Sequence, residues 1–289
     1  MLESNLRISA GKGLFLLVCW WVLLTVAGSL IMGFIGSEST ASLRWMIVVQ
    51  DLAVFILPVV LTVIIASTTP WRYICIDTTP SVKMTALTTV SAIVSIPAMN
   101  RLVAWNESIH LPASWSGLES VLRDSENAAQ AMVHQIMGGS TVWDLIAAIL
   151  IVGVLTGIAE ELFFRGALQR LLQSKFGNKH LAIWSAAFIF SAVHLQFFGF
   201  FPRLLMGAYF GYLVVWSGSL RLSMFAHALN NSLVVLNFWL LNRNLNCGTD
   251  LNHLGDGNTA GSIIICIISL AASAGVIWAI WKNRTVAAK

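Results

Sequence analysis

The 289-residue chain has few charged residues: Asp, Glu, Lys and Arg together make up 10% of it, whereas 57% of its residues are hydrophobic. Water-soluble globular domains carry about 25% charged residues, so this composition excludes that class and favours an all-α, polytopic integral membrane protein. The apolar runs are continuous and about 20 residues long, as a helix needs in order to cross ~30 Å of hydrocarbon. Continuous runs also argue against a β-barrel, because barrel strands alternate in polarity.

Cysteine is scarce as well. The four cysteines, Cys19, Cys75, Cys247 and Cys266, are scattered without CxxC spacing, which indicates neither a disulfide framework nor a cysteine-based zinc site. The net charge is only +4, and the basic residues are spread over several connections. The sequence therefore gives little support to a nucleic-acid-binding surface, and we expect the lipid bilayer to be the main partner.

Apolar windows predict about eight transmembrane helices in one integral membrane domain that covers residues 1–289. These windows are 13–34, 46–66, 84–104, 142–172, 180–198, 201–217, 221–241 and 262–281. The first follows a basic start that resembles a signal peptide, but it lacks a small-residue cleavage site and is long enough to span. We therefore expect it to be retained as a membrane helix.

Lys and Arg are distributed unevenly between the two ends of the predicted bundle. If the N-terminus is inside, the inner side holds Arg7, Lys12, Arg72, Lys83, Arg170, Lys175, Lys179, Arg221, Lys282, Arg284 and Lys289. The outer side holds Arg44, Arg101, Arg123, Arg203 and Arg243. The positive-inside rule then places both termini in the cytoplasm. Since no eukaryotic sorting signal such as a C-terminal KDEL is present, we expect a multi-pass protein of a bacterial inner membrane.

Two polar connections have distinct characters. In residues 107–141, Trp115, Leu118 and Val121 recur at helical spacing beside charged residues, which predicts an amphipathic helix on the outer interface. Residues 242–261 are rich in Asn, Gly and Asp, which predicts an irregular external connection.

Three ionisable residues interrupt the apolar segment 145–164 or follow it at once: Glu160, Glu161 and Arg165. A charge in the hydrocarbon zone costs at least ~2.5 to 3.5 kcal/mol, so an intramembrane functional site is the default interpretation. Glu161 and Arg165 have i, i+4 spacing, and we assign them to a structural ion pair. Glu160 points about 100° away from Glu161. Beside a cavity, desolvation would raise the pKa of Glu160 and make it a better proton acceptor.

Further polar residues lie in later predicted spans. His194 follows Phe190 by one turn, and His227 shares a helical face with Asn231. A carboxylate, two imidazoles and an amide from three helices can meet in the core of a bundle. They are the groups needed to add water to a peptide carbonyl, because Glu160 can take the proton and Asn231 can stabilise the oxyanion.

These residues resemble the motifs of the CPBP intramembrane proteases, a family that includes the type II CAAX prenyl endopeptidases and bacteriocin-processing or self-immunity proteins. EExxxR, FxxxH and HxxxN are all present within residues 142–241, in the order of the family. The resemblance implies an intramembrane endopeptidase that acts on a membrane-associated peptide or protein. It implies that Glu160 and His194 activate water, while His227 and Asn231 bind the oxyanion.

The family is also commonly labelled metalloprotease, so Glu160, His194 and His227 are an alternative set of zinc ligands. We favour a reaction that requires no cofactor. The sequence contains no HExxH, and Asn is an uncommon zinc ligand but a good oxyanion donor.

Other interpretations compete with this one. The charged and polar residues can be ion bridges and hydrogen bonds that join helices, and Asp51, Pro58, Pro97 and Asn100 favour kinks and buried hydrogen bonds. Arg203 and His180 are expected at the interface. A membrane protein that binds a peptide or confers immunity without cleavage is the alternative function. A proton-coupled transporter is a third hypothesis, although the sequence shows no inverted repeat.

Overall fold

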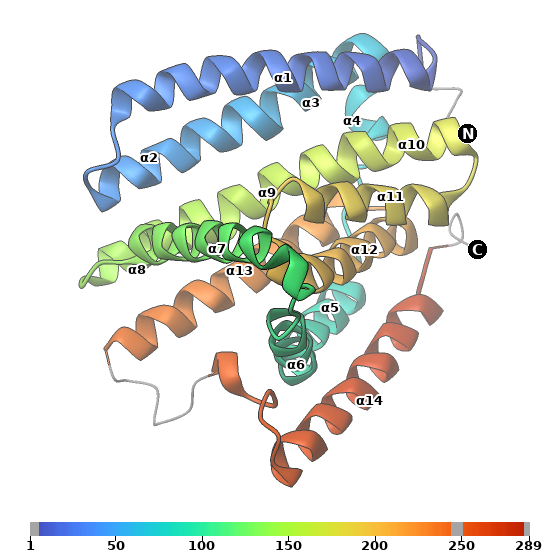
Figure 1. Cartoon of the computed structure of the whole chain (residues 1–289). Coiled ribbons are helices and arrows are strands. Elements are labelled where there is room, and N and C mark those ends of the chain that lie inside the picture. The colour runs from blue at the N-terminus through green and yellow to red at the C-terminus, as the bar shows by residue number, and fades with distance from the viewer. Residues whose placement is uncertain (1–5, 244–250, 286–289) are drawn as a thin grey trace.

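A computed structural model describes residues 6–243 and 251–285 of the chain (Figure 1). The described residues are 83% helical and include no strand, which confirms the predicted polytopic helical bundle. Cys19, Cys75 and Cys266 are free. Cys247, Lys289 and residues 244–250 of the predicted connection lie outside the described residues.

The helices follow one another with short connections. Their bounds are α1 (Ala10–Ile35), α2 (Thr40–Gln50), η2 (Asp51–Ile56), α3 (Leu57–Ala66), α4 (Pro70–Tyr73), α5 (Val82–Val94), α6 (Ile96–Glu107), η3 (Ala113–Trp115), α7 (Ser116–Met137), α8 (Val142–Ala148), η4 (Ile149–Leu155), α9 (Thr156–Glu161), η5 (Leu162–Leu168), α10 (Gln169–Phe176), α11 (Lys179–Ala192), η6 (Phe197–Gly199), α12 (Phe200–Ser217), α13 (Leu220–Asn242), η7 (Leu251–His253) and α14 (Ala260–Lys282).

The described part of the chain has six helices long and apolar enough to cross a membrane, or seven if the bent pair α5 and α6 is one span. The sequence predicted eight. The difference lies at residues 180–198, where α11 has only 14 residues, or about 21 Å at 1.5 Å per residue. It is short because the chain turns away from the helix at Val193, directly before His194. The orientation of the bundle in the membrane stays a prediction.

The third predicted span is bent by 49° between α5 and α6. Pro97 lies in the first turn of α6, where it cannot donate a backbone hydrogen bond to the preceding turn. Ser269 of α14 binds both sides of the break: its hydroxyl donates to Val94 O at 2.6 Å and accepts from Ala98 N–H at 3.1 Å. A neighbouring helix thus satisfies backbone groups at the break, as kinked membrane helices require.

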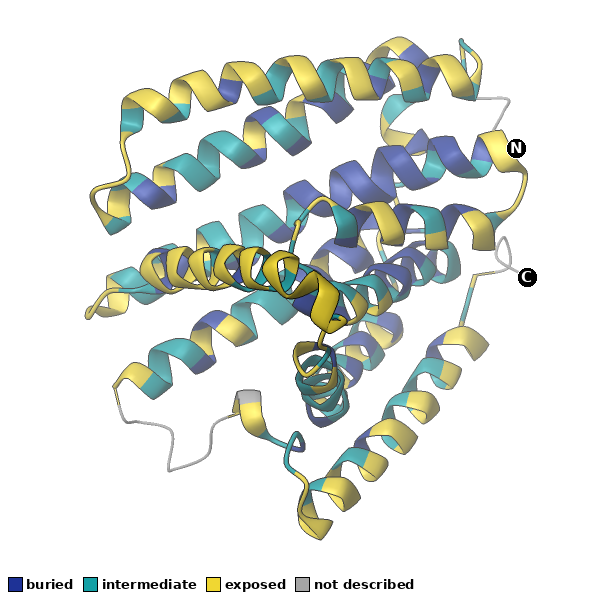
Figure 2. Cartoon of the chain, in the orientation of Figure 1, coloured by how far each residue is buried: buried dark blue, intermediate teal, exposed yellow. Residues whose placement is uncertain are grey.

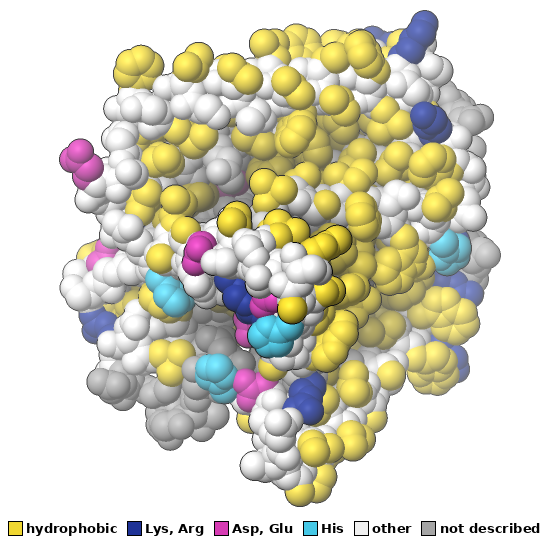
Figure 3. Space-filling view, in the orientation of Figure 1, with side chains coloured by type: hydrophobic (Ala, Val, Ile, Leu, Met, Phe, Trp, Pro, Cys, Tyr) yellow, Lys and Arg dark blue, Asp and Glu magenta, His cyan; other side chains and the backbone are white. Residues whose placement is uncertain are grey.

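Burial is continuous in the central part of the long helical segment from Val142 to Phe176, which runs through the middle of the bundle (Figure 2). Every residue from Ala159 to Gln169 is buried there. In contrast, α1 and α14 expose many apolar side chains, including Phe15 and Ile268 (Figure 2). Figure 3 shows hydrophobic side chains over much of one face, with charged ones gathered near α6 and α7. Lipid tails are as apolar as these side chains, so their exposure fits a membrane protein.

Two glycines set the distance between this central segment and α13. A Cβ atom at Gly157 would lie 2.8 Å from Ala228 N and 3.2 Å from His227 C. A Cβ at Gly153, one turn earlier, would lie 3.3 Å from Ser232 Cα. Small residues four apart allow such close backbone approach between membrane helices. This packing brings His227 beside the glutamates of α9.

Gly157→Ala should therefore destabilise the folded protein. The added methyl group would push α13 away, and overpacking of this kind costs about 1–3 kcal/mol. Thermal unfolding in detergent measures the effect. Gly275→Ala in α14 is the matched control, since nothing lies within 4 Å of a Cβ at that position. Equal stability of the two variants would contradict the close helix contact.

The amphipathic helix predicted in residues 107–141 is α7, which lies across the near side of the bundle (Figure 1). Trp115 and Val121 are exposed, whereas Glu126 is buried. Glu119 anchors the start of α7, because its carboxylate accepts the Leu111 N–H at 2.8 Å and the Arg123 Nε–H at 2.9 Å. Hydrogen bonds lower the pKa of Glu119 to about 2. The largest contribution comes from the Leu111 N–H, and smaller ones come from His110 and Arg123.

Candidate active site

Glu160 and Glu161 end α9, a single α-helical segment between two π-helical segments, η4 and η5. π-Helical turns within longer helices often mark functional sites, because they shift side chains out of the regular register. Glu161 is fully buried, and Glu160 keeps 8% of its surface exposed. The two adjacent carboxylates therefore have different surroundings, as their sequence positions predict.

The Glu161 carboxylate binds three side chains. Its Oε1 accepts from Arg165 Nη1 at 2.6 Å and lies 2.9 Å from His227 Nδ1, and its Oε2 accepts from the Ser223 hydroxyl. Arg165 also donates to Gly207 O at 2.9 Å, and its guanidinium lies 4.6 Å from the centre of the Phe190 ring. The i, i+4 ion pair expected from the sequence is thus present, and it joins α9 and η5 to α12 and α13.

His227 lies between the two glutamates. Its Nδ1 donates to Glu161, because that carboxylate is paired with Arg165 and can only accept. Its Nε2 then faces Glu160 Oε2 at 3.6 Å. Phe210 of α12 stacks on the imidazole at 4.9 Å with an angle of 25° between the planes, so the ring cannot turn freely. The arrangement fixes which nitrogen of His227 faces Glu160.

His194 lies just after the end of α11, in the turn that leads to η6. Its Nδ1 donates to Phe190 O at 2.7 Å, since a carbonyl oxygen can only accept. In the neutral ring, Nε2 therefore carries the lone pair. Glu160 interacts electrostatically with His194, and so does His227. Glu160 and His227, from two of the motifs, therefore both act electrostatically on His194, from the third.

Asn231 lies one turn after His227 on α13, beside η4. Its Nδ2 donates to Val152 O at 3.4 Å, and its Oδ1 accepts from Asn230 Nδ2 at 3.3 Å. It makes no direct hydrogen bond with Glu160 or His227 in the described structure. The contact with Val152 O uses one of the two hydrogens of the Asn231 Nδ2 group.

Two side chains of the site were not predicted from the sequence. Ser223 and Phe210 hold the Glu161 and His227 side chains, respectively. Asp51, the first residue of η2, makes the buried hydrogen bond that the sequence favoured: it is fully buried and accepts from the Thr156 hydroxyl at 2.8 Å. Its Oδ1 has no hydrogen-bond partner among the described residues. Asp51 also interacts electrostatically with Glu160. A carboxylate inside an apolar span was the feature of the sequence that singled out Asp51. Thr156, one turn before Glu160, connects Asp51 to the helix that carries Glu160.

A metal ion would need several ligand side chains grouped together. Among the described residues, no three His, Cys, Asp or Glu side chains lie close enough together to hold one metal ion. Glu160, His194 and His227 do not form such a set in this conformation.

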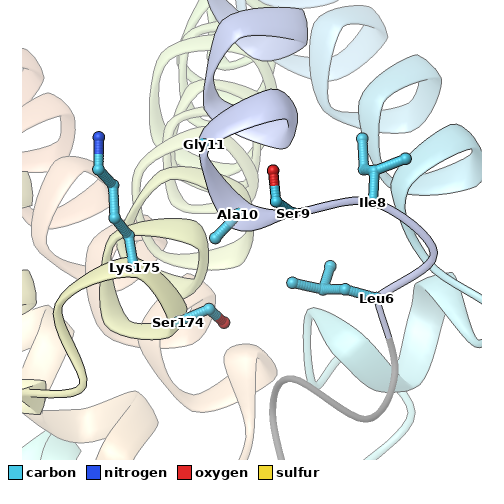
Figure 4. A pocket seen from close by; sticks show the side chains of 7 residues that line it. All are labelled: Leu6, Ile8, Ser9, Ala10, Gly11, Ser174 and Lys175. Atoms are coloured by element: carbon cyan, nitrogen blue, oxygen red, sulfur yellow. The ribbon is translucent and has the colours of Figure 1, made fainter.

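A largely apolar cavity of about 810 Å³ lies between the bent pair α5 and α6 and helices α12, α13 and α14. Phe210, Ala226 and Asn230 are among its lining residues, so it adjoins the residue whose ring stacks on His227. A smaller pocket of about 340 Å³ lies where the start of α1 meets the end of α10 (Figure 4). No site residue lines that second pocket.

Comparison with known proteins identifies one matching family model. Residues 142–233 match the model described as type II CAAX prenyl endopeptidase Rce1-like. The matched segment contains Glu160, Glu161, Arg165, His194 and His227, together with Asn231. No curated protein and no solved structure matches the chain.

Proposed function

From the membership of this chain in the CPBP family of intramembrane CAAX-type proteases, we propose that it is a glutamate-dependent endopeptidase. It hydrolyses a peptide bond of a membrane-associated peptide or protein. The observation that carries the proposal is the position of His227, with Glu161 on one ring nitrogen and Glu160 at 3.6 Å from the other. An ion pair that only joined helices would not need the second carboxylate.

The proposed roles follow from the partners of each side chain. Glu161 is occupied by Arg165 and His227, which leaves Glu160 as the carboxylate with room to take a proton from water. The Nε2 lone pair of neutral His194 is a second acceptor and can orient the same water. The water oxygen attacks the peptide carbonyl, Glu160 receives its proton, and that proton passes to the leaving amine.

The developing oxyanion needs hydrogen-bond donors. An imidazolium at His227 carries a proton on both nitrogens, and the two carboxylates within about 4 Å stabilise its positive charge. Its Nε2–H and the Nδ2–H₂ group of Asn231 are the donors that we assign to the oxyanion.

The surroundings of the site favour a substrate that arrives through the membrane. The large cavity adjoining Phe210 is lined mainly by apolar side chains, and Asn230 brings it next to Asn231. An apolar segment of a membrane-associated peptide fits such a lining better than a soluble, charged peptide does.

His194→Ala should lower the rate of peptide hydrolysis by about 10²-fold or more, as expected for loss of a positioned acid or base. The measurement compares peptide release by purified variants in liposomes. The matched control is His180→Ala in the first turn of α11, because the His180 side chain is exposed and its ring hydrogen-bonds to the Tyr212 hydroxyl. Unchanged hydrolysis in folded His194→Ala would remove His194 from the mechanism.

A further inference from the structure

The loop that follows His194 has an unusual backbone conformation. We define the His194 loop as residues 193–199. Leu195 in this loop has φ of 55°, in the left-handed region that residues other than glycine rarely adopt. The Leu195 side chain is 79% exposed, so its own packing does not hold this conformation. Contacts made by the rest of the loop must hold it.

Asn106, at the end of α6, joins the loop to the start of α12. Its side chain is fully buried. Its Nδ2 donates to Phe197 O at 3.3 Å, and its Oδ1 accepts from Phe201 N–H at 2.9 Å. One amide thereby satisfies a backbone acceptor and a backbone donor on either side of η6, which fixes the path of the chain there.

Glu126 holds the same loop from α7. It is 9% exposed, and its Oε2 accepts from Phe198 N–H at 3.0 Å. The Arg123 guanidinium lies 3.9 Å from the centre of the Phe198 ring, one turn before Glu126 on the helix. The amphipathic helix α7 therefore binds both the backbone and the side chain of Phe198.

Arg203 of α12 supplies the third attachment. Its guanidinium donates to the backbone oxygen of Gln196 at 2.5 Å and to the side-chain oxygen of Gln196 at 2.8 Å. A Cβ at Gly199 would lie 2.7 Å from Arg203 Nη1, so the loop passes close to this side chain. Arg203 therefore binds both the backbone and the side chain of Gln196 in the loop.

We propose that Asn106 and Glu126 are positioning residues for the peptidase reaction, which fix the His194 imidazole by fixing the loop that follows it. The proposal rests on the proposed function, in which His194 orients the attacking water. Both residues lie outside the matched segment 142–233. A displacement of about 1 Å in a reacting group can cost about 10²-fold in rate, so loop contacts distant from the substrate affect catalysis.

The first experiment compares two asparagines of α6. Asn106→Leu removes both hydrogen bonds to the loop with little change in volume. Asn100→Leu is the matched control, because Asn100 Nδ2 donates instead to Leu251 O at 2.7 Å and to Leu254 O at 3.0 Å. With an internally quenched peptide built on a cleavage site found by peptide profiling, Asn106→Leu should lower kcat by about 10- to 100-fold and leave KM little changed. Asn100→Leu should keep the kcat of the wild type.

The second experiment uses a conservative variant. Glu126→Gln keeps an oxygen that can accept from Phe198 N–H and should retain kcat, whereas Glu126→Leu loses the acceptor and should lower it. Amide hydrogen exchange in residues 195–201 supplies a readout that does not depend on cleavage. Phe201 should exchange faster in Asn106→Leu and Phe198 in Glu126→Leu, while Asn100→Leu and Glu126→Gln should match the wild type.

Glu160→Gln belongs in the same series. If it cleaves like the wild type, the proposed function is wrong, and the positioning proposal falls with it. If Glu160→Gln is inactive but Asn106→Leu and Glu126→Leu keep the wild-type kcat, only the positioning proposal is overturned. Unchanged exchange at Phe198 and Phe201 in these leucine variants would overturn it as well, because the loop would then be held by other contacts.

Discussion

Glu160→Gln is expected to lower the rate of peptide hydrolysis by about 10²- to 10⁴-fold, which is the usual contribution of a positioned general base. Glutamine has nearly the same shape but cannot take a proton from water. The fold should survive, because the side chain keeps 11% of its surface exposed and is not part of the Glu161–Arg165 ion pair. The rate of peptide release by purified protein in liposomes measures the effect.

The matched control is Glu38→Gln, which removes a carboxylate from the exposed connection between α1 and α2. It should hydrolyse peptide at the wild-type rate. Hydrolysis by folded Glu160→Gln at that same rate would show that another group activates the water. Asp51, the carboxylate that interacts with Glu160 and binds Thr156, would then be the first residue to test.

Arg165→Met is expected to have the largest effect on stability. Arg165 and Glu161 are both fully buried, and breaking a buried pair leaves a charge that costs about 3–5 kcal/mol in stability. Unfolding of the purified protein in detergent, followed by circular dichroism, measures this loss. The double variant Glu161→Gln/Arg165→Met should regain part of the stability, because it leaves no unpaired charge.

Arg123→Met provides the comparison, since it breaks the partly exposed Glu119–Arg123 pair of α7 and should destabilise far less. Equal losses for Arg123→Met and Arg165→Met would contradict the structural role of Glu161 and Arg165. A double variant no more stable than Arg165→Met would show that lost packing, and not the unpaired carboxylate, determines the effect.

The parts of the site that the sequence predicted depend on local geometry. The i, i+4 spacing of Glu161 and Arg165 predicts their ion pair, because side chains four apart share a helical face. The amphipathic pattern of residues 107–141 predicts α7, and Pro97 predicts the bend in the third span for the same local reason.

The parts that it missed depend on contacts between distant segments. Ser223 reaches Glu161 across 62 residues, and Thr156 reaches Asp51 across 105. No spacing rule relates residues so far apart. The end of α11 was missed because the apolar pattern continues through Val193 and beyond, although the chain leaves the helix there. This early end of α11 reduces the number of long spans and places His194 in a loop.

The most direct test of the account is mass-spectrometric profiling of peptides from native membranes that carry the wild-type chain or Glu160→Gln at equal expression. If Glu160 activates the water, some peptide termini should be present with the wild type and absent with Glu160→Gln. Those termini would identify both a substrate and the cleaved bond. Identical profiles would contradict hydrolysis at Glu160 and would favour a membrane protein that binds a peptide without cleaving it.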